Sequence, residues 1–215
     1  MVLVERDYAV LRELDRWRFA LSRHLRYLGG FSGQRACDRR LKILIDAGYI
    51  NRKHVLYGVP GLCFVTHKGK ILSRLSPKPD KFKVDQIVHD IAMLDTAVYF
   101  ILKDGLSLCD ITTEKQLHQQ DGFGNRQHKP DFVFVKDGKT VCVEIELTPK
   151  AKSRMEKNLQ DNFMTYDRQI WVVPQTQIKI LRTLEEQSSN YPNIEVLDLA
   201  AVQDFLKANK ENGGS

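Results

Sequence analysis

Three carboxylates lie in or beside the two most apolar, β-like stretches of the sequence. Asp131, Glu144 and Glu146 all fall within the segment KPDFVFVKDGKTVCVEIELTPK, residues 129–150. Burying a charged group is costly unless a partner compensates it. The pattern therefore raises the question of what such a partner is.

The Asp-Gly pair at 137–138 predicts how these carboxylates are arranged. Asp and Gly both tolerate the positive φ of a type I′ turn, so the segment is expected to form a β-hairpin with a two-residue loop. Lys136 then pairs with Lys139, and Asp131 lies opposite Glu144. Because side chains alternate along a strand, the three acids share one face and the other face is wholly apolar.

Like charges on directly opposed strand positions destabilise a sheet. Three compensations are open: a bound cation, a raised pKa of one carboxyl, or basic neighbours such as Lys129 and Lys150. A hard divalent cation, Mg²⁺ or Mn²⁺, fits best, with Asp131, Glu144 and Glu146 as ligands. Beside a DNA phosphodiester such an ion supports nuclease chemistry. The alternative is a pair of solvent-facing acids at a strand end, in a hairpin whose register differs from this one.

The elements that must position these acids follow from periodicity and turn signals. A long amphipathic helix is expected at 83–103, and the polar segment QQDGFGNRQHK at 119–129 is expected to be a mobile loop. Thr148 is expected to cap a helix with Pro149 at its first position. The expected order is α-β-β-β-α-β-α with a weaker β-α addition. The remaining strands are expected at 107–118, 170–173 and, at the edge of the sheet, 194–197. The remaining helices are expected at 148–166, 177–187 and 200–207.

Charge separates the first third of the chain from the rest. Residues 1–80 carry 16 Lys and Arg against 7 Asp and Glu, whereas residues 81–215 carry 17 against 20. The basic excess favours a polyanion-binding module at the N-terminal end. The four cysteines are scattered and indicate neither a zinc site nor disulfides.

The N-terminal pattern predicts a winged helix-turn-helix. Two helices are expected within 5–28, meeting near Trp17 and Arg18, and a third helix is expected from the cap Ser32 to Ala47. Strands at 53–57 and 62–66 form a hairpin, and Thr66 caps a short helix. In this motif the third helix enters the DNA major groove. The candidate DNA contacts are Gln34, Arg35, Arg39, Arg40, Lys42, Arg52 and Lys53; the alternative is that they form an ordinary solvated surface.

These patterns predict an α+β and α/β protein. Its parts are a winged-helix domain at 1–76, a linker at 77–82, a mixed-sheet domain at 83–208 and a disordered tail at 209–215. No apolar run is long enough for a membrane span, so a cytoplasmic protein without a membrane partner is expected.

The second domain resembles the PD-(D/E)xK nuclease superfamily, in Pro130-Asp131, in Glu144-Ile145-Glu146 and in the restriction-endonuclease-like order α-β-β-β-α-β. The resemblance implies that Asp131 and Glu144 hold the metal. The family's lysine falls where this chain has Glu146, a departure shared with some restriction enzymes that carry E-x-E. Lys150 is a candidate for the missing positive charge.

A longer resemblance covers residues 5–175, through the Phe64–Gly69 element, the helix that bears His89, K-P-D and E-I-E-L-T. Over these residues the chain is similar to the plasmid replication-relaxation family and to mobilisation relaxases that lack the usual tyrosine chemistry. His89 is a candidate base, ligand or phosphate contact, or a structural histidine, and His128 is an equal candidate.

This resemblance implies a plasmid or mobile-element protein. The implied partners are double-stranded DNA at a replication or transfer origin, with single-stranded DNA as a further candidate, and relaxosome or replication proteins. Two functions remain open. One is a metal-dependent site-specific endonuclease, acting as a nicking relaxase or replication initiator. The other is a non-catalytic DNA-binding regulator or relaxosome accessory protein with a degenerate nuclease domain.

Overall fold

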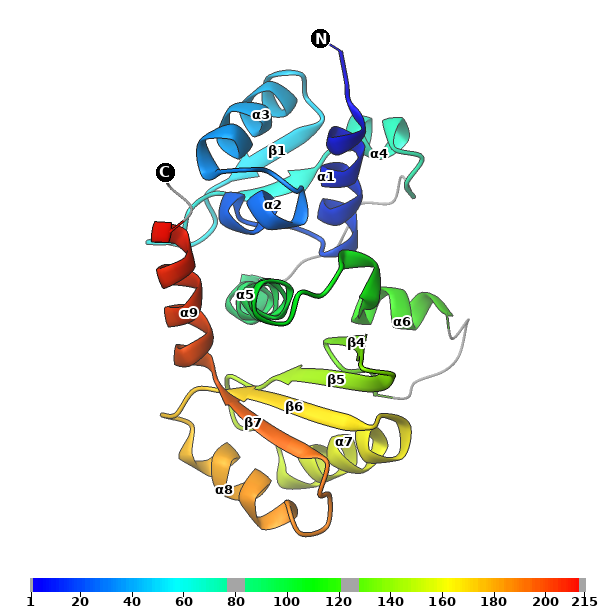
Figure 1. Cartoon of the computed structure of the whole chain (residues 1–215), viewed down its shortest axis with the longest axis vertical. Coiled ribbons are helices and arrows are strands. Elements are labelled where there is room, and N and C mark those ends of the chain that lie inside the picture. Colours follow the sequence, from blue (N-terminus) through cyan, green and yellow to red (C-terminus); the bar gives the residue numbers. More distant parts are fainter. Residues whose placement is uncertain (1, 77–83, 121–127, 213–215) are drawn as a thin grey trace. The chain divides into compact units, whose positions relative to one another are not determined.

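The computed structural model describes residues 2–76, 84–120 and 128–212, which belong to two compact units (Figure 1). The first unit comprises Met1–Leu94 with Asn209–Ser215, and the second comprises Asp95–Ala208. The predicted linker at 77–82 lies outside the described residues, as does most of the predicted loop at 119–129. Each unit is a mixture of helices and strands.

The first unit contains three helices followed by a hairpin and a short fourth helix. The predicted division of 5–28 into two helices that meet near Trp17 and Arg18 is confirmed. Ala20, between these helices, forms an antiparallel bridge with Cys63 of the hairpin, through N–H···O distances of 3.1 and 2.8 Å. The elements are α1 (Glu5–Arg16), α2 (Ser22–Leu28), α3 (Gln34–Asp46), β1 (Ile50–Lys53), β2 (Leu62–Val65) and α4 (His67–Leu72).

The apolar stripes of these helices form the core of the first unit. Their fully or almost fully buried members include Leu11, Leu14, Trp17, Leu25, Cys37, Leu41 and Leu44. Thr66 caps α4 as predicted, because its hydroxyl accepts a hydrogen bond from the Gly69 amide at 3.1 Å. A Cβ atom on Gly69 would lie 2.4 Å from the carbonyl oxygen of Tyr49. Glycine is therefore required where α4 approaches this backbone.

Two boundaries in the first unit differ from the sequence prediction. The residue before α3 is Gly33, not the predicted cap Ser32, and no side chain caps the helix. β1 spans Ile50–Lys53 rather than 53–57. The reason is burial. Ile50 is 2% exposed and pairs with Val65, so strand pairing starts at Ile50, and the apolar residues that follow β1 lie in the connection between β1 and β2.

The second unit is built around a five-stranded mixed sheet in the order β3-β4-β5-β6-β7. The first three strands are antiparallel, while β6 runs parallel to both β5 and β7. The mixed sheet was expected from the sequence. The elements from the end of the first unit onward are the short 3₁₀ turn Val84–Gln86, α5 (Ile87–Asp104), the 3₁₀ turn Leu108–Asp110, β3 (Ile111–Thr113), α6 (Glu114–Gln120), β4 (Phe132–Lys136), β5 (Lys139–Ile145), α7 (Lys152–Thr165), β6 (Arg168–Val173), α8 (Ile178–Gln187), β7 (Ile194–Asp198) and α9 (Leu199–Asn212).

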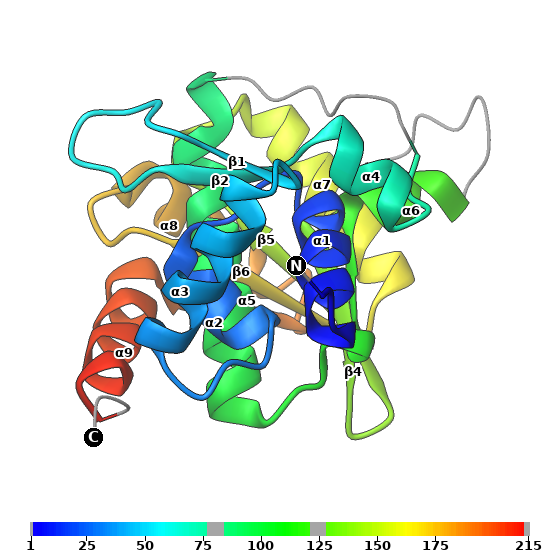
Figure 2. The same ribbon diagram turned by 90° about the horizontal axis from the view of Figure 1, so that it is seen from above.

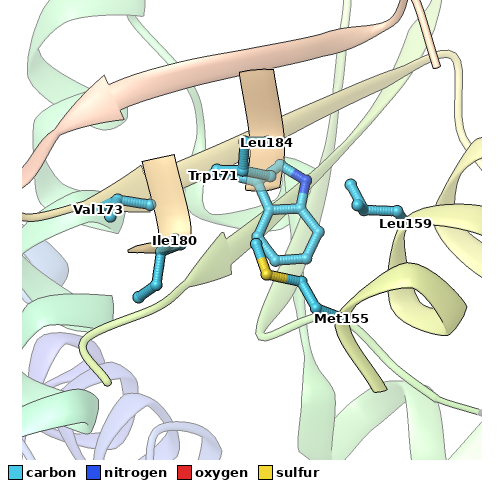
Figure 3. Close-up of a cluster of buried hydrophobic side chains, with 6 residues drawn as sticks. All are labelled: Met155, Leu159, Trp171, Val173, Ile180 and Leu184. Atoms are coloured by element: carbon cyan, nitrogen blue, oxygen red, sulfur yellow. The ribbon is translucent and has the colours of Figure 1, made fainter. Parts of the chain in front are cut away.

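Helices cover both faces of this sheet (Figure 1). On one face α5 packs against β4, where the rings of Phe100 and Phe134 lie 5.0 Å apart. On the other face α7 and α8 enclose Trp171 of β6, which is fully buried. Figure 3 shows this cluster, which consists of Met155, Leu159, Trp171, Val173, Ile180 and Leu184.

Three predicted elements of the second unit need correction. The strand expected at 107–118 is only Ile111–Thr113, and α6 follows it directly. The backbone N–H and hydroxyl of Thr113 donate to Gln116 Oε1 at 3.0 and 3.1 Å, so a T-x-x-Q sequence starts a helix here. α7 begins at Lys152, after Ala151 and not after Thr148. α9 continues through Asn212, into the tail expected to be disordered.

Candidate functional site

The β4–β5 hairpin has the predicted turn and register. Asp137 and Gly138 have φ values of 53° and 74°, and Lys136 pairs with Lys139. These angles are those of a type I′ turn. The apolar face of the hairpin is buried on the α5 side, as expected for Phe132 and Phe134.

The opposite face of the hairpin, covered by α7, carries Glu144. Its position on β5 pairs in register with Trp171 on β6, and its side chain is buried, with 3% of the residue exposed. Glu144 Oε1 accepts a hydrogen bond from Asn162 Nδ2 at 3.0 Å and contacts His128 Nε2. A donor on α7 and a histidine thus compensate this buried carboxylate.

Glu146 lies directly after β5, and its amide donates to the Val172 carbonyl at 3.0 Å. The residue is 2% exposed, and Lys150 Nζ lies 2.5 Å from its Oε2. This contact is an ion pair rather than a hydrogen bond, because Glu146 Oε2 has no hydrogen-bond partner of acceptable geometry among the described residues. Burial raises the pKa of Glu146, Lys150 opposes that rise, and the nearby charges of Glu144 and Asp131 add to it.

Asp131 precedes β4 and is half-buried. Its Oδ2 accepts a hydrogen bond from the Ile145 amide at 2.7 Å, and its carbonyl accepts one from Glu114 at 2.9 Å. The carboxylate therefore continues the hairpin's hydrogen bonding one step beyond the last strand pair. The prediction that Asp131 and Glu144 lie at the same end of the hairpin is consistent with these contacts.

The three carboxylates are near neighbours, but they do not form a ready-made metal centre. Within the described ranges, no three His, Cys, Asp or Glu side chains are placed together to hold an ion. Instead His128 contacts Glu144, and Lys150 pairs with Glu146. Metal binding by Asp131, Glu144 and Glu146 therefore stays a prediction.

The two candidate histidines have different surroundings. His128 contacts Glu144, and its candidate role stays a prediction. His89 belongs to the first unit by its position in the chain, and its Nδ1 lies 3.4 Å from Asp90 Oδ1 on the same helix. Its predicted role as base, ligand or phosphate contact stays a prediction.

Sequence analysis missed the amide side chains of α7. Asn158 and Asn162 are 4% and 1% exposed, and Asn162 bonds Glu144. The sequence pattern that predicts their burial is present, because the two asparagines are four residues apart and lie beside the apolar Met155 and Leu159. Polar residues on the buried face of a helix need partners.

In the first unit, the predicted DNA contacts fall into two groups. Arg35, Arg39 and Lys53 are exposed, and none of their side chains has a hydrogen-bond or ion-pair partner in the part of the chain that the structure describes. The other four side chains contact neighbours. Gln34 donates to Ser22 and Asp38, Arg40 binds Asp7 and Val2, Lys42 pairs with Asp46, and Arg52 donates to Gly61.

Arg40 is the clearest member of the second group. Asp7 is fully buried, and Arg40 Nε donates to its Oδ1 at 2.7 Å. Burial raises the pKa of Asp7, but the Arg40 hydrogen bond, the Val4 amide and the charges of Arg40 and Arg6 together outweigh it and lower the pKa. Arg40 thus compensates a buried charge, which was not anticipated from its place in a basic run.

No protein-family model matches this chain, and neither the curated proteins nor the solved structures include a significant match. Over the residues that are described, no helix combines the length and apolar character needed to cross a membrane.

Proposed function

We propose that this protein binds DNA through its first unit and cleaves it at the carboxylate cluster of its second unit with a divalent cation. The observation that carries the proposal is the burial of two carboxylates side by side. Glu144 and Glu146 are 3% and 2% exposed, at the hairpin end where Asp131 also lies. Such an arrangement is unfavourable for folding alone. Burial raises the pKa of Glu146, and acids with a perturbed pKa concentrate at functional sites.

The first unit supports DNA binding through its element order and its charge. Three helices, a bridging segment at Ala20 and an antiparallel hairpin follow the order of a winged helix-turn-helix. Arg35 and Arg39 lie one turn apart on α3, both exposed. Two guanidinium groups so spaced suit neighbouring phosphates or guanine edges.

The second unit supports nuclease chemistry through the order of its elements. α5, the β3-β4-β5 meander, α7 and the parallel strand β6 match the α-β-β-β-α-β order of PD-(D/E)xK nucleases. The additional helix α6 lies between β3 and β4. The proposed plasmid or mobile-element setting, as relaxase or initiator, rests on the sequence resemblance.

The donor set fits a hard divalent cation in chemical type. Mg²⁺ requires only one or two carboxylates and completes its shell with water and phosphate oxygens. Asp131, Glu144 and Glu146 would hold Mg²⁺ or Mn²⁺, which when bound supplies Lewis acidity to a phosphodiester. Asn162 orients Glu144, since its amide donates to Oε1. Lys150, paired with Glu146, is the cation available to contact a phosphate.

Cleavage is tested with a supercoiled plasmid that carries the DNA flanking the protein's own coding region. With Mn²⁺, wild type should convert it to open circle, while Asp131→Asn and Glu144→Gln should lose this activity. Asparagine keeps an acceptor for the Ile145 amide, so the hairpin is preserved. Glu185→Gln, an exposed acid on α8, is the matched control. Equal activity in wild type and Asp131→Asn would refute the catalytic proposal.

DNA binding is tested separately by fluorescence anisotropy over a range of salt concentrations. Arg35→Ala and Arg39→Ala should each weaken binding and reduce the salt slope by about 1 if they contact phosphate. Arg182→Ala, an exposed arginine on α8, should leave both unchanged. Equal effects of all three substitutions would place the DNA contact elsewhere.

A second candidate, a DNA-binding protein without catalysis, is favoured by the partners that the two buried glutamates already have. Glu144 contacts His128 and accepts a hydrogen bond from Asn162, and Glu146 pairs with Lys150. This candidate predicts the same DNA affinity with and without EDTA, and no heat when Mn²⁺ is titrated into the protein. A Mn²⁺ binding heat that Glu144→Gln abolishes would exclude it.

A further inference from the structure

The connection between β1 and β2 presents a tyrosine to solvent. It spans residues 54–61 and extends beyond the strands, away from α1 (Figure 2). Tyr57 is 107% exposed, so neither face of its ring is covered. Val55, Leu56, Val59 and Pro60 surround it in the sequence, and the segment His54–Pro60 lines an open hollow of about 530 Å³.

A defined turn holds Tyr57 at the tip of this connection. The Val59 amide donates to the Leu56 carbonyl at 3.3 Å, so Tyr57 and Gly58 are the two central residues. Gly58 has φ of 74°, which a type II turn requires at its third position. The ring is therefore presented by an ordered backbone, which lowers the entropic cost of using it in binding.

The sequence around Tyr57 is basic and contains no acidic residue. Arg52, Lys53 and His54 are exposed at the start of the connection. From Ala47 to Ser76 the sequence has five Lys and Arg and no Asp or Glu. A polyanion is thus attracted to this hairpin, and no acidic side chain of the segment repels it.

We infer that Tyr57 stacks on an unpaired base of a bound DNA strand while Arg52, Lys53 and His54 contact the adjacent phosphates. This inference rests on the proposed DNA binding and deepens it. Exposed aromatic rings beside basic residues are the usual platform for single-stranded nucleic acid, because every base has a stacking face. In an intact duplex the bases are stacked on each other, so the ring favours a strand that is locally open.

The test measures the affinity of the full chain for a labelled duplex and for the same duplex with a central mismatched bubble. Stacking contributes about 1–3 kcal/mol per base, so Tyr57→Ala should weaken bubble binding by roughly 5- to 150-fold and change duplex binding little. Tyr57→Phe should keep the bubble affinity. Lys53→Ala, the phosphate control, should weaken both complexes equally and reduce their salt dependence.

Tyr57→Trp gives a direct optical readout. The two native tryptophans, Trp17 and Trp171, are 2% and 0% exposed, so the introduced indole is the one that solvent and DNA reach among the described residues. Stacking should quench its emission when the bubble substrate is added, and the plain duplex should quench it less.

The outcomes separate this inference from the proposed function. If wild type binds DNA but Tyr57→Ala matches it on both substrates, the stacking role is wrong and an apolar protein partner becomes the better explanation for the tyrosine. If wild type binds neither substrate at low salt, the proposed DNA binding is wrong and the stacking role falls with it.

Discussion

Replacing Lys150 with methionine removes the cation that faces the buried carboxylate of Glu146. Methionine is similar in length, so the substitution changes charge more than packing. The side chains of Glu146 and Lys150 are 3% and 29% exposed. Breaking a buried ion pair costs about 3–5 kcal/mol. Because water reaches Lys150, we expect a loss of about 2–4 kcal/mol in the free energy of unfolding at neutral pH.

The loss should depend on pH with a defined sign. Burial, aided by Glu144 and Asp131, raises the pKa of Glu146 above its unfolded value, so the folded state binds more protons than the unfolded state. The contribution of Glu146 to stability is then full below its unfolded pKa and falls as pH rises through the folded pKa. Without Lys150 the folded pKa rises further, so Lys150→Met should be least destabilising in acid.

Urea unfolding at several pH values measures this effect. Tryptophan fluorescence in a Trp17→Phe background reports the second unit, through the buried Trp171. The matched control is Lys152→Met, whose pair with Glu186 spans 3.6 Å with side chains 64% and 61% exposed. Exposed pairs contribute about 0–1 kcal/mol, so this control should change little.

Adding Glu146→Gln to Lys150→Met should restore most of the lost stability, because no buried charge is then unpaired. A Lys150→Met protein as stable as the Lys152→Met control, or equally destabilised at all pH values, would refute the reasoning.

Three further predictions concern single positions. Gly138→Ala should lower stability by about 1 kcal/mol in thermal unfolding. The φ of 74° is the sole cause of this loss, because a Cβ at this position meets no atom within 4 Å. A loss of several kcal/mol would contradict this reasoning. Arg40→Met should destabilise the first unit by about 2–4 kcal/mol at neutral pH, as measured by denaturation. In wild type, the contribution of Asp7 is present above its unfolded pKa and lost as pH falls through its lowered folded pKa, so the difference between the two proteins should shrink in acid. Trp171→Ala should cost about 3–5 kcal/mol by leaving a cavity under α7 and α8, and a smaller loss would indicate that the helices close over it.

The site was partly predictable because its most important feature is local. The Asp-Gly pair sets the hairpin register, and strand alternation then assigns Glu144 to one face and Phe132 to the other. Both effects act within a few residues. The sequence does not specify which helix covers the acidic face, because this depends on where α7 packs when the chain returns through β6. The contact between Asn162 and Glu144 depends on the same packing.

The boundaries were predicted less well where tertiary burial overrides local pattern. The run Val55–Tyr57 is as apolar as a strand, yet β1 ends at Lys53 because Ile50 is the residue that the core buries. Conversely, α6 forms where a strand was expected, because the hydrogen bonds between Thr113 and Gln116 stabilise a helix start.

By itself, the sequence determined the order of most helices and strands, the hairpin register and the gathering of three acids at one hairpin end, since these follow from spacing along the chain. Only the tertiary structure decided which more distant side chains face these acids and which basic side chains remain exposed. His128 and Glu144 are brought together by folding, as are Arg40 and Asp7. Such pairs join residues distant in sequence, and their energies depend on burial, which no local pattern specifies.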